Sequence, residues 1–564
     1  MERVASQLTA SRFNVLKSAN SERDASSSMP KWKVALIVGI PVAIGAGVVY
    51  YLYRRSKGKR KKVMNLVADQ RTTPKQIDKN TPNANDVKED PFSKAMSAKN
   101  SGNRYFKAGK YQKAIECYTE AIRLCPDDKN EDLATFYQNR AASYEMLKNY
   151  SNVIEDCTSA FNFNRKYIKA LQRRAKAYES IESLDEALTD ITAVCILEHF
   201  QNQPNLIMTD RILRQKSKAR AKEFIRQRIP QMPSDPFIRH YFMSYTKHPL
   251  IDDPNITGQK LEEMLKELSS NNSDPERDAK IGLIKGTINI LKGDIKNGEI
   301  ELDKVAKLDN CDKDIKVNAL IKLGTLKVHE IDGNAEGLKN SMECFEEALK
   351  LDPENADIYI HRAQIYLLGE QIDEAKSDLE KCCSLAPSFP SAIAQKLYVK
   401  FRCAVRFNDE DGKRRTMRDF EEAIRKFPKS SEVYSLYAQS LMEQQEYERA
   451  DENFLSAIKC DPNDANLYVH RGILQLQWTN SIEKAVKLLE KALETDDKCQ
   501  FAYEMLGSIE VQRGNLQKGI DCFEKALSIA QTELDCTHLF ALRDAAEAQF
   551  KAVQALGIEL PTSS

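Results

Sequence analysis

A set of small and large residues recurs along this chain with fixed internal spacing. In the earliest set, six residues follow one another at intervals of 3, 9, 4, 3 and 5: Gly102, Tyr105, Ala114, Tyr118, Ala121 and Pro126. Two later sets repeat these intervals: Ala363, Tyr366, Ala375, Leu379, Cys382 and Pro387; and Ala438, Leu441, Ala450, Phe454, Ala457 and Pro462. Small residues at helical spacing predict pairs of closely packed helices that stack on their neighbours.

These intervals resemble the tetratricopeptide repeat, a pair of antiparallel helices with small residues where they approach closely. The resemblance implies an all-α superhelix in two solenoid segments. Three repeats are expected near 95–133, 134–167 and 168–201. Seven more are expected near 279–312, 317–355, 356–389, 390–430, 431–464, 465–499 and 500–533, followed by a capping helix over about 535–555.

The repeat pattern is lost between about Phe200 and Asp278, where the Pro-rich stretch QRIPQMPSDPF lies. Because a stack needs continuous contacts between neighbours, this gap predicts a boundary between two segments. Within the gap, Arg211 to Arg228 carries eight basic residues. A solvated helix that packs on one face is favoured over a nucleic-acid site, since no aromatic platform accompanies the charge.

A membrane anchor is predicted near the N-terminus. Val34 to Tyr53 is a run of twenty residues without a charge, long enough to span roughly 30 Å of hydrocarbon. The basic run RRSKGKRKK, Arg54 to Lys62, follows it. A cleaved signal peptide would carry its basic residues before a shorter apolar core. A nuclear or nucleic-acid role for the basic run is disfavoured directly behind a membrane span. The positive-inside rule therefore predicts an uncleaved anchor with the C-terminal body in the cytosol.

Composition and the lack of catalytic motifs argue against several classes of function. The net charge of +1 argues against a polyanion-binding protein, and thirteen scattered cysteines without a CxxC pair indicate reduced thiols. The sequence contains no P-loop, GxGxxG, GxSxG or HExxH motif, and its seven histidines lack metal-ligand spacing. We therefore expect no enzyme activity, no cofactor and no metal site.

A stripe of cations and amides crosses the first three repeats. If the first small residue of each repeat is position 8, then positions 2, 5, 6 and 9 lie on one face of its first helix. Five polar residues occupy these positions, without a counter-charge among them: Lys99, Asn103, Asn139, Lys169 and Arg173. Such a set suits the end of a peptide that carries a terminal carboxylate and an Asp side chain. The alternative is a solvated groove face with incidental cations.

The five residues resemble the dicarboxylate clamp of tetratricopeptide co-chaperones, which hold the EEVD tails of cytosolic heat-shock chaperones. With the anchor and the interrupted array, the chain resembles the family of large tetratricopeptide preprotein receptors of the mitochondrial outer membrane. That resemblance implies a single-pass protein with its N-terminus in the intermembrane space. Its implied partners are chaperone tails, mitochondrial preproteins, other subunits of the outer-membrane translocase and the lipid bilayer, with no nucleic acid. A clamp-bearing receptor of the endoplasmic reticulum is the alternative.

The resemblance also implies a preprotein pocket in the C-terminal repeats, with Glu432 as a peptide-contacting residue. The predicted lining is Tyr359, His361, Glu432, Tyr434, Gln439 and His470. The predicted organisation is an N-terminal tail (1–33), a transmembrane anchor (34–53), a basic flank and flexible linker (54–92), a clamp domain (93–201), an inter-segment helical region (202–278) and a C-terminal array with a capping helix (279–564).

Overall fold

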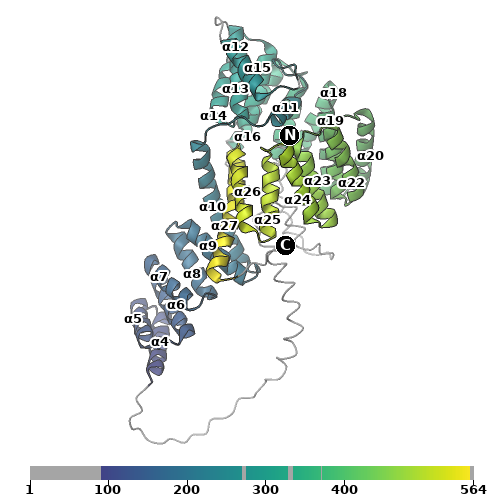
Figure 1. The fold of residues 1–564 in the computed structure, drawn as a ribbon. Helices are drawn as coiled ribbons and strands as arrows, with labels where there is room; N and C mark the ends of the chain where they lie inside the picture. The colour runs from purple at the N-terminus through teal and green to yellow at the C-terminus, as the bar shows by residue number, and fades with distance from the viewer. Residues whose placement is uncertain (1–89, 254, 270–274, 328–334, 370, 559–564) are drawn as a thin grey trace, which may run out of the picture. The chain divides into compact units, whose positions relative to one another are not determined.

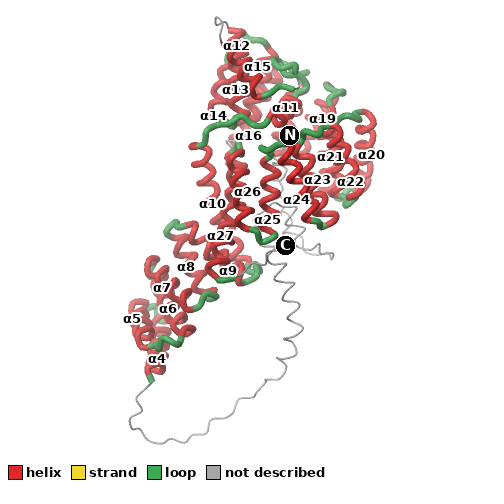
Figure 2. The backbone as a smooth tube through the Cα atoms, in the orientation of Figure 1, coloured by secondary structure: helices red, strands yellow, loops and turns green. Residues whose placement is uncertain are grey.

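The described part of the chain is entirely helical. The computed structural model describes residues 90–558, except 254, 270–274, 328–334 and 370. These residues form 24 helices, α4 to α27, and no strand (Figure 2). The predicted all-α tetratricopeptide fold is confirmed for them. The predicted tail and anchor lie outside the described residues, and none of the described helices is long and apolar enough to cross a membrane.

Most of the described helices follow one another with short connections, and most consecutive helices pack together (Figure 1). The first seven are α4 (Pro91–Lys107), α5 (Tyr111–Leu124), α6 (Asn130–Met146), α7 (Tyr150–Phe163), α8 (Ile168–Ser180), α9 (Leu184–Leu197) and α10 (Gln203–Gln227). The next five are α11 (Asp235–Met243), α12 (Gly258–Ser269), α13 (Pro275–Leu291), α14 (Ile295–Ala306) and α15 (Lys313–Lys327).

The remaining helices continue the same arrangement to the end of the described chain. They are α16 (Ala335–Leu351), α17 (Ala356–Leu368), α18 (Ile372–Leu385), α19 (Pro390–Arg406), α20 (Glu410–Lys426), α21 (Ser431–Glu443), α22 (Tyr447–Cys460), α23 (Ala465–Thr479), α24 (Ile482–Thr495), α25 (Gln500–Gln512), α26 (Leu516–Ile529) and α27 (Glu533–Leu556).

The described residues group into two compact units. One unit contains residues 90–220 together with 510–521 and 540–558. The other contains Ala221–Ile509 and Cys522–Leu539. The first three repeats thus share a unit with residues from the C-terminal end of the chain, a grouping that does not follow chain order.

Small residues of the repeat pattern lie where large side chains pack. Tyr118 of α5 is buried against Gly102 of α4, and a methyl group at Gly102 would lie 2.6 Å from the Tyr118 ring. Ala114 and Ala121 are fully buried in the same repeat. The small residue therefore sets how closely the two helices of a repeat approach.

We expect Gly102→Ala to destabilise the protein although alanine favours helix. Replacing a helical glycine gains about 1 kcal/mol of helix propensity, but moving a packed ring costs about 1–3 kcal/mol. Gly472, at the corresponding place in a later repeat, is the matched control, since its added methyl would find no atom closer than 3.4 Å. Gly472→Ala should be neutral or stabilising. Thermal unfolding of both variants tests this, and equal shifts would contradict it.

Three repeats each contain a buried ion pair between their two helices, which the sequence did not lead us to expect. An arginine of the first helix donates two hydrogen bonds to an aspartate sixteen residues later, at 2.7–2.9 Å. The pairs are Arg140–Asp156, Arg174–Asp190 and Arg362–Asp378, and the aspartate side chains are at most 8% exposed. The recurring spacing of sixteen was the signal that could have revealed them.

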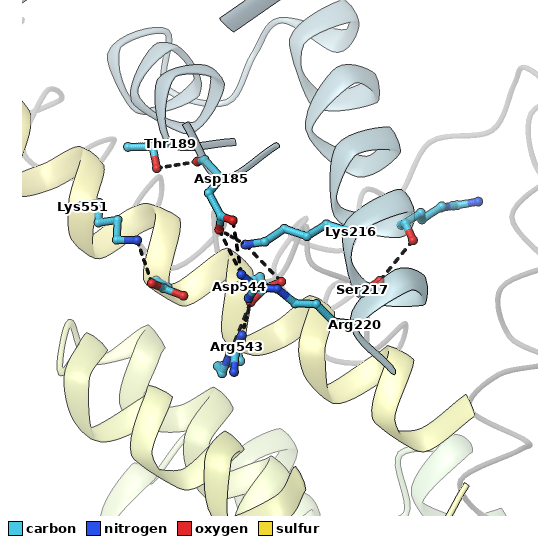
Figure 3. Close-up of polar contacts among 10 residues, drawn as sticks. Asp185, Thr189, Lys216, Ser217, Arg220, Arg543, Asp544 and Lys551 are labelled. Atoms are coloured by element: carbon cyan, nitrogen blue, oxygen red, sulfur yellow. Dashed lines mark hydrogen bonds and ion pairs between the residues drawn. The ribbon is translucent and has the colours of Figure 1, made fainter. Parts of the chain in front are cut away.

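A second buried network joins α9, α10 and α27 within the unit that contains the first three repeats (Figure 3). Arg220 of α10 donates to Asp544 of α27 at 2.7 Å, and Lys216 lies 2.5 Å from Asp185 of α9. Lys216 also lies 3.2 Å from Asp544, whose side chain is completely buried, and Arg543 approaches the same carboxylate at 2.7 Å. The C-terminal part of α27 is therefore held by charge against α10.

Candidate functional site

The five predicted clamp residues lie on the first helices of three adjacent repeats. Lys99 and Asn103 are on α4, Asn139 is on α6, and Lys169 and Arg173 are on α8. Helix α6 packs against both α4 and α8. Lys169 is exposed and the other four are half-buried. All five side chains thus retain access to solvent, as a peptide-binding stripe requires.

Arg173 has a partner that the sequence analysis did not predict. Its Nε donates to Glu145 Oε2 of α6 at 2.6 Å, and its Nη1 donates to the Gln138 carbonyl at 3.4 Å. Among the described residues, no hydrogen bond is formed by Nη2. Nε and Nη1 of the guanidinium are therefore held within the protein, and Nη2 is left to bond a carboxylate. The sequence predicted no counter-charge at the stripe positions, and Glu145 lies outside those positions. Arg173 nevertheless has an acidic partner in the structure.

Asn103 is oriented by a buried tyrosine. The Tyr118 hydroxyl donates to Asn103 Oδ1 at 2.8 Å. Burial raises the pKa of Tyr118 to about 12, so its hydroxyl keeps the proton that it donates. Because the amide oxygen is occupied, the Asn103 NH₂ group is the one left to bond an incoming acceptor.

The stripe carries an excess of positive charge. Lys99, Lys169 and Arg173 supply three cations, and Glu145 supplies one anion. Within the part of the chain that the structure describes, Lys99 Nζ makes a weak contact, 4.0 Å from Met96 Sδ. With these cations and the oriented amide, the arrangement can bind a small group of carboxylates from solvent.

The six predicted pocket residues are distributed over three helices of the other unit. Tyr359 and His361 are on α17, Glu432, Tyr434 and Gln439 are on α21, and His470 is on α23. Within the described residues, the hydrogen bonds of Tyr359, Glu432 and Gln439 go to residues outside the six. Glu432 accepts from Ser391 and, at 3.3 Å, from Gln395.

Several of these residues are held by their surroundings. The Tyr359 hydroxyl donates to the Pro353 carbonyl at 2.8 Å, and Gln439 donates to Ser435 at 3.4 Å. The His470 ring stacks on a neighbouring phenylalanine. Tyr434 is half-buried.

His361 differs from the others because it is buried. It is 5% exposed and its ring lies 4.4 Å from the ring of Tyr245. Burial, with the nearby Lys322 charge, lowers the pKa of His361 to about 3. The imidazole is therefore neutral, and a direct part for it in binding would require Tyr245 to move.

A buried lysine beside this site was missed by the sequence analysis. Lys322 Nζ donates to Asn318 Oδ1 at 2.7 Å and lies 3.4 Å from His248 Nε2. It also lies 4.2 Å above the centre of the Tyr245 ring. Burial lowers the pKa of Lys322 to about 7.

The lowered pKa of Lys322 predicts a rise in stability with pH. Between pH 7 and 10.5 the unfolded lysine retains a proton that the folded one has released, so the free energy of unfolding increases with pH. From pH 7 to 9 the increase should be about 2 kcal/mol. Urea unfolding of the wild-type chain and of Lys322→Met at both pH values tests this. Loss of the increase in the variant is expected, and parallel pH profiles would contradict the assignment.

Known proteins match both individual repeats and nearly the whole chain. Family models described as tetratricopeptide repeats match residues 102–148, 344–377 and 502–533. The chain is 38% identical over 578 residues to the mitochondrial import receptor subunit TOM70 of Rattus norvegicus, covering 95% of this chain and 94% of that protein. The Homo sapiens protein of the same name gives the same identity and coverage.

The crystal structure of yeast Tom70 is also similar, with a TM-score of 0.45 and 23% identity, and it covers 82% of this chain and 96% of that one. The sequence identity to the rat and human proteins, and the share of each chain that is covered, are both high enough to establish the family. The chain therefore belongs to the family of the mitochondrial import receptor subunit TOM70, as the sequence predicted.

Proposed function

We propose that this chain is a receptor of the mitochondrial outer membrane that docks cytosolic heat-shock chaperones through their EEVD tails and accepts the hydrophobic preproteins they deliver. The observation that carries this proposal is the solvent-accessible stripe of three cations and two amides on α4, α6 and α8. The family name, import receptor, supports the same role.

The stripe suits a peptide that ends in aspartate. Such a peptide presents two carboxylates close together, and each needs cations or N–H donors. Lys99 and Lys169 supply flexible cations, while Arg173 offers Nη2 of a guanidinium held by Glu145. Asn103 supplies an amide N–H₂ whose direction Tyr118 fixes. Asn139 supplies a second amide.

The C-terminal repeats are proposed to receive the preprotein around Glu432. Burial raises the pKa of Glu432, while the hydrogen bonds from Ser391 and Gln395 oppose the rise. A half-buried carboxylate, with Tyr434 half-buried on the same helix, suits a cationic or apolar targeting segment. The mechanism is one of binding and transfer rather than catalysis.

The predicted anchor offers a test between the mitochondrial outer membrane and the endoplasmic-reticulum membrane. The uncharged run 34–53 is only moderately apolar and is followed by a strongly basic flank. We expect residues 1–65 fused to a fluorescent protein to label mitochondria, with its C-terminal part accessible to protease added outside. The same fusion with Arg54–Lys62 replaced by serines is the control. Reticular labelling by the unaltered fusion would favour the endoplasmic-reticulum receptor.

A further inference from the structure

The ion pair that holds Arg173 has a counterpart on the next helix but one of the chain. Arg173 of α8 donates from Nε to Glu145 of α6 at 2.6 Å. Arg211 of α10 donates from Nε and Nη2 to the two carboxylate oxygens of Glu179 on α8, each at 2.9 Å. If the first small residue of a repeat is again position 8, both glutamates occupy position 12 of their helices. Helix α10 therefore meets α8 as α8 meets α6.

The burial pattern of α10 gives the same register. If Arg211 corresponds to Arg173 at position 6, then Leu213 is at position 8, and it is 2% exposed where Ala175 of α8 is fully buried. Position 2 is Ile207, which is 63% exposed, and position 9 is Arg214, which is also exposed. The face of α10 that carries Arg211 is thus the face that carries the clamp residues in the three repeats. The stripe continues onto a fourth helix within the same compact unit.

The guanidinium of Arg211 is held in the same manner as that of Arg173 but is more accessible. Its side chain is 59% exposed, while that of Glu179 is 22% exposed. Nε and Nη2 bond Glu179, and within the described residues Nη1 forms no hydrogen bond. A guanidinium that is already oriented loses less freedom when it bonds a second carboxylate. Arg211 can therefore keep Glu179 and still accept a ligand at Nη1.

The surroundings of Arg211 keep an excess of positive charge. Arg214 lies on the same face and shares its charge with Asp210, 3.0 Å away. Lys176 is exposed at position 9 of α8, on the stripe and one turn before Glu179. Three cations thus outnumber two carboxylates, so this part of the stripe favours an acidic peptide over a basic one.

The spacing of the helices gives the distance along a bound peptide. Neighbouring packed helices lie about 10 Å apart, and an extended chain advances about 3.3–3.6 Å per residue. One step along the stripe therefore equals about three residues. A peptide whose last residue lies at Arg173 would place the residue three positions before it at Arg211. In a tail that ends in EEVD, that residue is the first glutamate.

We propose that Arg211 is a further specificity-determining residue of the clamp, which binds an acidic side chain three residues before the end of the tail. The incoming carboxylate accepts from Nη1, while Glu179 holds Nε and Nη2. This inference rests on the proposed docking of chaperone tails. It adds a fourth helix to the site and a second place at which the tail must be acidic.

The test uses calorimetric titration of the full chain in detergent with two synthetic peptides of equal length, one ending in EEVD and the other in QEVD. The wild-type chain should bind the EEVD peptide roughly threefold to fivefold more tightly, because the glutamine cannot form the ion pair. Arg211→Ala should lose that preference, with its affinity for EEVD reduced by the same factor. Arg211→Lys should keep most of the preference, because the charge remains.

The matched control is Arg123→Ala, which removes an arginine of α5 that is exposed and paired with Glu120. It lies outside the stripe, so the full preference for EEVD should remain. Equal binding of the two peptides by the wild-type chain would overturn the inference, and so would a preference that survives Arg211→Ala. In either case, a loss of binding in Arg173→Ala would leave the docking of tails supported. Binding of neither peptide by the wild-type chain would contradict the docking itself, and the inference with it.

Discussion

Replacing Arg173 by alanine should weaken the binding of an EEVD peptide by roughly tenfold to a hundredfold. A hydrogen bond to a charged group contributes about 1.5–3 kcal/mol, which corresponds to that range of Kd. Nη2 of the guanidinium is the donor that the groups around Arg173 leave for a carboxylate of the tail. Calorimetric titration of the full chain measures the change.

The folding cost of Arg173→Ala should be small but measurable. Arg173 and Glu145 are 20% and 34% exposed, so their ion pair contributes about 1 kcal/mol or less. Arg165→Ala, which removes an exposed arginine before α8, is the control for general loss of charge. Unchanged tail affinity in a folded Arg173→Ala protein would mean that the stripe is only a solvated face.

Asp190→Ala should cost far more stability than any change on the surface of the same repeats. It would leave Arg174, whose side chain is 12% exposed, without the carboxylate that it contacts at 2.7 and 2.8 Å. Breaking a buried pair by removing one partner costs about 3–5 kcal/mol. Because α9 packs on α8, hydrogen exchange of both helices should accelerate.

The matched control is an ion pair that is equally short but exposed. Arg123 and Glu120 lie 2.5 Å apart with 67% and 46% of their side chains exposed. Glu120→Ala should therefore leave the free energy of unfolding nearly unchanged. Equal losses in the two variants would show that burial does not determine the value of these pairs.

The repeat fold could be predicted because it depends on short-range spacing. The repeat spacing places a small residue, Gly102, and a large one, Tyr118, where two helices approach closely. In the structure the Tyr118 ring packs against Gly102. The helix assignment of the clamp residues follows from the same register. Whether they bind a tail stays a prediction, since position on a helix does not establish a ligand.

The features that sequence reasoning missed depend on contacts between distant residues. Glu145 meets Arg173 across 28 positions, and Asp544 meets Arg220 across 324. Residues 228–248 showed no repeat pattern, so their carboxylate partners, such as Asp461, were indistinguishable from ordinary loop residues. His361 was placed on the groove stripe by its register, but register could not show that Tyr245 covers it.

The proposed clamp would recognise a peptide end through its carboxylates. The most direct test titrates the full chain with a peptide ending in EEVD and with the same peptide carrying a C-terminal carboxamide. The free acid should bind, and the carboxamide should bind at least about tenfold more weakly, because one charged acceptor is lost. Arg173→Ala should narrow that difference. Equal binding of the two peptides by the wild-type chain would show that the clamp does not recognise the terminal carboxylate.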